Sequence, residues 1–214
     1  MRFQIIDAEQ RSSEWFAARA GRATGSRAAD ILGKLKSGKE SAARRDYRMQ
    51  LVAERLTGTP QDDGYVNSAM QRGIELEQLA RAAYEARTGN IVRTTGFLAM
   101  PNHMVGCSLD GDIDDFQGII EIKVPKTATH LGYIRANQAP TEYLPQITHN
   151  LWVSGAAYCD FVSFDDRLPE HLQFFCIRVE RDSKALEEYE AELDRFLSEV
   201  DAEYKEISKM RVAA

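Results

Sequence analysis

The sequence predicts an α/β fold in which a mixed β-sheet is flanked by helices. Up to about residue 90, apolar residues recur mainly at helical spacing. From residue 91 the pattern changes to short runs of β-branched and apolar residues separated by glycine or proline, which is typical of strands. Helices first, then an antiparallel run, a crossing helix and two more strands indicate a mixed sheet with helices on its faces.

The N-terminal part is expected to contain four helices. The first spans 12–20 with a serine cap, the second spans 26–36 with Ser26 as its N-cap, and the third spans 41–57. The fourth, within 67–90, has the clearest pattern, because it is amphipathic and ends at a Gly-Asn stop. Its shared apolar face consists of Leu76, Ala80, Ala83 and Tyr84.

The remainder of the chain is expected to supply the sheet. The expected strands are 91–100, 104–109, 112–116, 118–124, 158–164 and 172–179. Helices are expected over 127–137 and over 144–154, where Pro145 suits a first turn. A last helix begins near Asp182, and its apolar residues recur at helical spacing as far as Ile207, so it is expected to pack on the sheet.

Length and composition fit one domain, 1–214, with a helical N-terminal region to about residue 90. The chain has 214 residues, of which 43% are hydrophobic and 28% charged, so it is able to bury a proper core. No stretch reaches the roughly 18 apolar residues of a membrane span. The N-terminus also lacks the apolar run of a secretory signal, so a cytoplasmic protein is expected. Without a CxxC pair, the three cysteines predict buried thiols: Cys107, Cys159 and Cys176.

The charge distribution bears on nucleic-acid binding. The net charge of −6 argues against a protein that coats DNA, because phosphate binding favours a basic surface. A metal-dependent enzyme, however, needs carboxylates in its site, and DNA can be held in a locally basic groove. The stretch 187–206 is acidic, whereas basic residues are concentrated between 19 and 55: Arg19, Arg22, Arg27, Lys34, Lys36, Lys39, Arg44, Arg45, Arg48 and Arg55.

The central chemical feature is Asp110 followed, after ten residues, by Glu121-Ile122-Lys123. In a strand, Glu121 and Lys123 project to the same side, while their apolar neighbours project into a core. Two charges on an otherwise apolar strand are costly unless something compensates them. A Mg²⁺ ion between Asp110 and Glu121 would do so, and Lys123 would position or deprotonate a water, or stabilise charge on a phosphate.

The same residues also fit a solvated strand face, because 33 acidic residues make such a spacing frequent by chance. Two details favour a site. The run GIIEIKVP is too apolar for an exposed edge strand, and Asp110 lies in a Gly-flanked acidic turn at a strand terminus. Glu77, on the border of the apolar face of its helix, is either a third site acid or a solvated flank.

Residues 19–26 offer a second candidate site. The start of a helix with Arg19, Arg22 and Arg27 nearby suits a phosphate group. Taken alone, the segment is better explained as an ordinary capped helix with solvated arginines.

Four motifs that follow one another along the chain favour a functional site over a solvated surface. The first motif is W-x3-R-x4-T-x-S, formed by Trp15, Arg19, Thr24 and Ser26, and the second is G-x3-E, formed by Gly73 and Glu77. The third is a PD-(D/E)XK core of Asp110, Glu121 and Lys123. The fourth is Y-x2-Q with a tryptophan six residues later, formed by Tyr143, Gln146 and Trp152. The ordered set covers about residues 12–165. It resembles the lambda-exonuclease, or YqaJ-type, viral recombination exonucleases of the PD-(D/E)XK nuclease superfamily.

The resemblance implies a restriction-endonuclease-like fold and a phage-type recombination enzyme. Such enzymes degrade one strand of duplex DNA processively from its 5′ end, which leaves a 3′ overhang. The cofactor implied is Mg²⁺, with Mn²⁺ as a substitute. The partners implied are double-stranded DNA ends and a single-strand annealing protein, and a homotrimeric ring around DNA is expected.

The resemblance also implies roles for individual residues. Asp110, Glu121 and the Ile122 carbonyl would bind the metal, and Lys123, Glu77 and Gln146 would complete the catalytic site. Residues that would hold the 5′-phosphate or the DNA are Arg19, Thr24, Ser26 and Tyr143. The family often has a second glutamine two residues after the first, and here that position is Thr148, which leaves the role of Gln146 open. The proline of the motif name is replaced by Leu109.

Two alternative functions remain open at the level of sequence. One is an endonuclease built on the same core, and the other is a non-catalytic DNA-binding module of the same fold. The arginine and serine near residues 19–26 favour end recognition over internal cutting. An intact Asp110, Glu121 and Lys123 set favours an enzyme over a decayed one.

Overall fold

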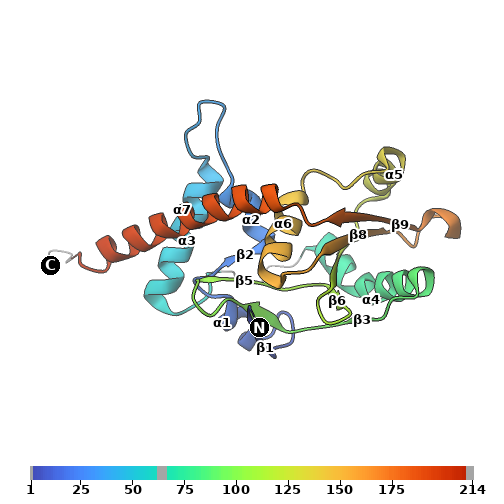
Figure 1. Cartoon of the computed structure of the whole chain (residues 1–214), viewed down its shortest axis with the longest axis horizontal. Helices are drawn as coiled ribbons and strands as arrows, with labels where there is room; N and C mark the ends of the chain where they lie inside the picture. The colour runs from blue at the N-terminus through green and yellow to red at the C-terminus, as the bar shows by residue number, and fades with distance from the viewer. Residues whose placement is uncertain (1, 62–66, 211–214) are drawn as a thin grey trace.

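The computed structural model describes residues 2–61 and 67–210 and places two β-sheets among seven α-helices and two 3₁₀ turns (Figure 1). The first sheet has the order β1-β4-β5-β2: β1 (Gln4–Ile6), β4 (Phe97–Ala99), β5 (Val105–Cys107) and β2 (Ala23–Thr24). The second has the order β3-β6-β7-β8-β9: β3 (Val92–Arg93), β6 (Gly111–Ile113), β7 (Gly118–Lys123), β8 (Tyr158–Phe164) and β9 (Phe174–Glu180).

The second sheet is the mixed sheet that the sequence predicts. Strands β7 and β8 run parallel, with Glu121 opposite Phe161, and their other neighbours are antiparallel. The parallel pair requires a crossover, which is supplied by α5 (Thr127–Ala136) and α6 (Leu144–Ser154). Both helices lie where the sequence predicts them, and Pro145 stands in the first turn of α6.

Four other predicted helices are confirmed with their caps. They are α1 (Ser13–Arg19), α3 (Ala42–Thr57), α4 (Ser68–Thr88) and α7 (Ser183–Ile207). The Ser12 hydroxyl accepts a hydrogen bond from the Trp15 amide at the start of α1. The α4 helix ends at Gly89, which has a φ of +76°, a conformation that glycine adopts without steric cost.

The prediction of a helix over 26–36 is wrong in its start and its length. The chain forms a 3₁₀ turn, η1 (Gly25–Arg27), and then the single-turn helix α2 (Ala28–Ile31). Ser26 is therefore inside η1 and caps nothing. The helix stops early because the chain turns back at Gly33, whose carbonyl accepts a hydrogen bond from the Ser41 amide at 3.0 Å.

The predicted strand 91–100 is two strands in different sheets. Strand β3 pairs with β6, whereas β4 pairs with β1 and β5. The break falls before Gly96, where a Cβ atom would lie 2.0 Å from the carbonyl oxygen of Ile6. The sequence did not predict the first sheet as a separate unit, because strands of two or three residues are too short to show a period of two.

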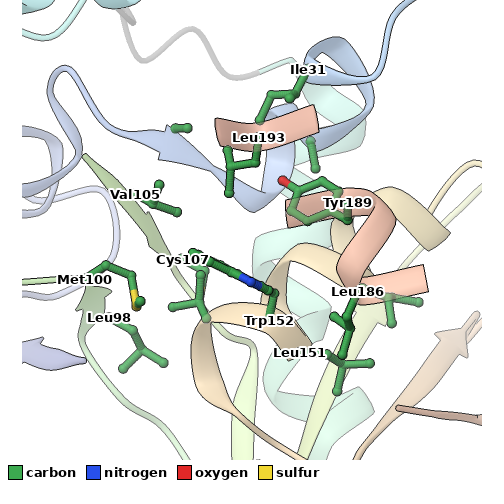
Figure 2. Packing of buried hydrophobic residues seen from close by; sticks show 14 of the residues in the cluster. Ile31, Leu98, Met100, Val105, Cys107, Leu151, Trp152, Leu186, Tyr189 and Leu193 are labelled. Carbon is green, nitrogen blue, oxygen red and sulfur yellow. The ribbon is translucent and has the colours of Figure 1, made fainter. Parts of the chain in front are cut away.

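Two apolar clusters hold the layers together. The larger cluster joins the two sheets to α2, α6 and α7, and Figure 2 shows part of it: Ile31, Leu98, Met100, Val105, Cys107, Leu151, Trp152, Leu186, Tyr189 and Leu193. The smaller cluster lies between α4 and the other face of the second sheet. Side chains alternate between the two faces of β7, so Ile119 belongs to the larger cluster, whereas Ile120 and Ile122 belong to the smaller one.

A buried polar network fixes α4 against the sheet. The Tyr84 hydroxyl donates a hydrogen bond to Asp160 on β8 at 2.6 Å, and Asn90 donates to the Tyr84 oxygen at 2.8 Å. The Arg178 guanidinium donates to both Asp160 oxygens at 2.8 and 2.9 Å. This network sets the position of α4, and with it the place of every side chain that α4 projects.

Much of the basic stretch 19–55 is paired with the acidic C-terminal helix. Arg44 and Arg48 on α3 form ion pairs with Glu199, and Arg48 also binds Glu203 at 2.7 Å. Arg55 binds Asp201 in the same interface. Figure 1 shows α7 (red) crossing α3 (cyan). These arginines therefore join α3 to α7.

The cysteines are thiols, as predicted, with Cys107 and Cys159 buried and Cys176 half-buried. Within the described part of the chain, each helix is too short or too polar to cross a bilayer.

Replacing Tyr84 with Phe should lower the free energy of unfolding by about 1–3 kcal/mol, because Asp160 loses a buried donor and Asn90 loses its acceptor. Urea unfolding measures the change. Tyr204→Phe is the matched control, since the described residues offer no hydrogen-bond partner to its hydroxyl, and it should stay within about 0.5 kcal/mol of wild type. Equal stability of the two variants would contradict a structural role for the network.

Candidate active site

Two acids meet across the β6–β7 hairpin. Asp110 immediately precedes β6, and Glu121 lies in the middle of β7. The Ile122 amide donates a hydrogen bond to Asp110 Oδ2 at 2.6 Å, which fixes the Asp110 carboxylate against the neighbouring strand. The hairpin therefore brings the two predicted metal-binding acids to the same end of the sheet.

Glu121 is an almost fully buried carboxylate, with 1% of the residue exposed. One of its oxygens accepts from the Lys123 ammonium, and the other accepts from Asn150 Nδ2 at 3.1 Å. Burial raises the pKa of Glu121 to about 7; the Lys123 charge lowers it, and the Asp110 and Glu77 charges raise it. Burial is the largest of these effects and the Asp110 and Glu77 carboxylates add to it, so a divalent cation at this site would favour the ionised form of Glu121.

Lys123 is held by several groups on the same side of the strand. Its ammonium contacts Glu121, lies 3.5 Å from Gln146 Oε1 and stands 5.0 Å from the centre of the Tyr143 ring. Burial lowers the pKa of Lys123, but the charges of Glu121 and Asp110 raise it, and the net direction is upward. Lys123 is therefore a cation at neutral pH.

Glu77 reaches the same site from α4. Its carboxylate pairs with Arg81 at 2.7 Å, one helical turn further on. Burial and the Asp110 charge raise the pKa of Glu77, against the lowering effects of Arg81, Arg11 and Lys123. Glu77 and Asp110 together line a cavity of about 470 Å³ between α4 and the loop that precedes α1.

Helix α6 places Gln146 and Thr148 on different faces. Gln146 faces Lys123, whereas Thr148 lines a groove between α6 and α7. Two residues along a helix turn the side chain by about 200°, so the two positions lie on nearly opposite faces. The structure therefore brings Gln146, and not Thr148, to Lys123. Tyr143 stacks on Phe161 and reaches the site from the turn before α6.

The predicted phosphate-binding residues gather in a second, smaller cavity. Arg19 Nη2 lies 3.5 Å from the Thr24 hydroxyl and 3.4 Å from the Ser26 hydroxyl, and its guanidinium stacks over Trp15 at 4.1 Å. Arg22 and Arg27 also line this cavity of about 70 Å³. Because η1 is a single 3₁₀ turn, the attraction for an anion comes from the arginine side chains and hydroxyls, and not from a long helix as the sequence suggested.

Sequence reasoning missed several residues that line these two cavities or contact Glu121. Tyr47 accepts a hydrogen bond from the Thr24 amide at 3.0 Å, and Arg81 pairs with Glu77. Asn150 donates to Glu121. The spacing of four residues between Gln146 and Asn150 on a predicted helix placed both on one face, so Asn150 was detectable from the sequence.

The donor atoms present fit a small, hard divalent cation. In the described ranges 2–61 and 67–210, no three His, Cys, Asp or Glu side chains converge as a ready-made cage. Mg²⁺ needs no such cage, because it binds one or two carboxylates and completes its shell with waters and substrate phosphate. Asp110 and Glu121 supply the carboxylates, and a cation would offset the cost of ionising the buried Glu121 beside Asp110 and Glu77.

The fold and the site together define the class of protein. A mixed sheet with Asp110, Glu121 and Lys123 clustered at one end of it is the arrangement of a PD-(D/E)XK deoxyribonuclease. Residues 14–157 match the family model described as the YqaJ-like viral recombinase domain. The chain belongs to this family.

Solved structures agree with that assignment. The alkaline exonuclease LHK-Exo from Laribacter hongkongensis is 43% identical, with a TM-score of 0.83 over 92% of this chain and 97% of that one. The same exonuclease in complex with dAMP gives a TM-score of 0.84 with the same identity and coverage. A phage-related exonuclease from Haemophilus somnus 129PT, at 16% identity and a TM-score of 0.65 over 87% of this chain and 96% of that one, shares the fold. A comparison with curated proteins gives no match.

The stability of the metal-free protein should fall as the pH rises from about 4.5 to about 7. Over this interval the folded chain holds a proton on Glu121 that the unfolded chain has released, so rising pH favours unfolding. Urea unfolding in EDTA across this range measures the effect, and Glu121→Gln should remove that part of the slope. A wild-type slope identical to that of the variant would contradict the raised pKa.

Proposed function

We propose that the chain is a Mg²⁺-dependent exonuclease that degrades one strand of linear duplex DNA from its 5′ end. The observation that supports this most directly is the placement of the arginine cavity beside the acidic site. A Cβ atom at Gly25, between Thr24 and Ser26, would lie 2.3 Å from Asn150, and Asn150 is bound to Glu121. A terminal phosphate near Ser26 would therefore lie close to the reacting phosphodiester. The resemblance to an alkaline exonuclease supports the same activity.

The residues that would hold the cation are Asp110, Glu121 and the carbonyl group of Ile122. A bound Mg²⁺ would supply a water of lowered pKa and would stabilise charge on the phosphate, and Mn²⁺ should substitute for it. Asp110 is held in place by the Ile122 amide, and Glu121 by Lys123 and Asn150. Such fixed ligands need little reorganisation when the cation binds.

Lys123 acts as a cation near the reacting phosphate. Its raised pKa favours charge stabilisation over proton abstraction. Gln146 Oε1 and the Tyr143 ring restrict where the ammonium can lie, and the amide of Gln146 would orient the attacking water. Glu77 would hold that water from the α4 side, since the pKa of its carboxyl is raised and it shares a cavity with Asp110.

End recognition would be the work of Arg19, Thr24 and Ser26. Both hydroxyls lie within 3.5 Å of the Arg19 guanidinium, in a geometry that suits a phosphate monoester. A terminal phosphate carries more charge than an internal diester, so the cavity should prefer a strand end. This supports the exonuclease over an endonuclease on the same core, and the intact acids support an enzyme over a non-catalytic module.

We also propose that the chain acts in phage recombination. The YqaJ-like viral recombinase family points to a phage recombination enzyme, so the 3′ overhang would be passed to a single-strand annealing protein in the cytoplasm. A homotrimeric ring would let the chain enclose its duplex. Native mass measurement and co-purification with an annealing protein test these two points separately from the chemistry.

Replacing Asp110 with Asn should reduce the rate of hydrolysis of end-labelled linear duplex by about 1000-fold or more, because several kcal/mol of metal-dependent stabilisation are lost. EDTA should have the same effect on the wild type. The exposed acid Asp114 supplies the matched control, and Asp114→Asn should keep the wild-type rate. Substantial hydrolysis in EDTA, or by the Asp110 variant, would refute the metal assignment.

Linear duplex with a 5′-phosphate should be degraded faster than the same duplex with a 5′-hydroxyl. Arg19→Ala should erase most of this preference, because a charge-assisted contact is worth about 1.5–3 kcal/mol, or roughly 10- to 100-fold. Slow, unselective hydrolysis should remain. Arg45→Ala, which alters an exposed arginine paired with Asp46, is the control and should keep the preference. Equal digestion of closed circles and linear DNA by the wild type would favour an endonuclease.

A further inference from the structure

Asn150 is a buried polar residue that none of the sequence motifs includes. It lies on α6 one helical turn beyond Gln146, and 1% of the residue is exposed. Its Nδ2 donates to Glu121 Oε2 at 3.1 Å. An ionised carboxylate only accepts hydrogen bonds, so in this state the nitrogen of the amide faces Glu121 and the oxygen faces away.

The other end of the amide lies against η1. Asn150 Oδ1 is buried and has no hydrogen-bond partner among the described residues. A Cβ atom at Gly25 would lie 2.3 Å from this oxygen, so the backbone of η1 approaches the amide as closely as a glycine allows. Gly25 does not have a positive φ. The absence of a side chain is therefore required for the close approach, and not for the backbone conformation.

The unpartnered oxygen argues against a purely structural role. A buried carbonyl oxygen without a donor destabilises the folded chain, and an apolar side chain of similar size would avoid that cost. An apolar side chain, however, could not donate a hydrogen bond to Glu121. With Lys123 on one carboxylate oxygen and Asn150 on the other, both oxygens of Glu121 are held in place.

We propose that Asn150 is a positioning residue, which orients the Glu121 carboxylate for the cation and transmits the position of η1 to it. This inference rests on the proposed metal-dependent function. Because Gly25 has no side chain, the proposed 5′-phosphate-binding turn η1 packs directly against the Asn150 amide, and the same amide holds the proposed metal ligand Glu121. A displacement of η1 then alters the cation site without any change to a ligand.

The first test measures Mn²⁺ binding by the full-length chain without DNA, from the electron paramagnetic resonance signal of free Mn²⁺. Asn150→Ala should weaken binding by about 10-fold or more, as losses of groups that orient metal ligands typically do. Gln173→Ala is the matched control, because the side-chain amide of Gln173 also donates to protein oxygens, the carbonyls of Asp166 and Leu168, but does not touch Glu121. It should bind Mn²⁺ as the wild type does.

The second test uses Gly25→Ala, which places a methyl group against Asn150 Oδ1 and touches no proposed ligand. It should also weaken Mn²⁺ binding. In the Asn150→Ala background the methyl group has room, so Gly25→Ala should add little further loss, and the two effects should be non-additive. Thermal unfolding checks that each variant is folded, and Asn150→Leu, which fills the space, replaces Asn150→Ala if the latter unfolds.

The outcomes separate this inference from the function on which it rests. Wild-type affinity in folded Asn150→Ala and Asn150→Leu variants, or strictly additive losses in the double variant, would overturn the positioning role alone. A wild-type chain that binds no Mn²⁺ and needs no metal for hydrolysis would overturn the proposed function, and the inference with it.

Discussion

The structure depends on one buried carboxylate. Glu121 lies in a strand whose neighbours are Ile120 and Ile122, and it is almost fully removed from water. A buried charge is tolerated when donors surround it, and here those donors come from β7 itself and from α6. The sheet and the crossover helix must therefore meet at Glu121, and the second parallel strand, β8, follows from the return of the chain after α6.

The two faces of β7 are covered by helices with different tasks. On one face, α6 supplies the side chains that hold Glu121 and Lys123. On the other, α4 packs on Ile120 and Ile122 and is fixed by the buried Tyr84 and Asp160 pair. This fixed helix carries Glu77 to the edge of the same site. Rigid packing on both faces is what allows groups from distant parts of the chain to be held at hydrogen-bonding distance.

The distribution of arginines resolves the apparent conflict between net acidity and a DNA substrate. Arg44, Arg48 and Arg55 are neutralised by the acids of α7, so they contribute to the packing of α3 on α7 and little to a DNA-binding surface. Arg19 and Arg22 instead line the small cavity near Ser26. A few arginines placed at one cavity can bind a phosphate although the chain carries a net charge of −6.

The sequence by itself determined the long elements and the catalytic motif. Helical period and caps located α4 and α7, and alternation in GIIEIKV placed Glu121 and Lys123 on one side of a strand, because these signals are local. Tertiary structure decided the rest. The first sheet, the short turn at Ser26 and the position of Gln146 beside Lys123 all depend on contacts between distant segments, as does the approach of Asn150 to Gly25. Such contacts leave no period in the sequence, since a two-residue strand or the close approach of Gly25 to Asn150 is fixed by the packing around it.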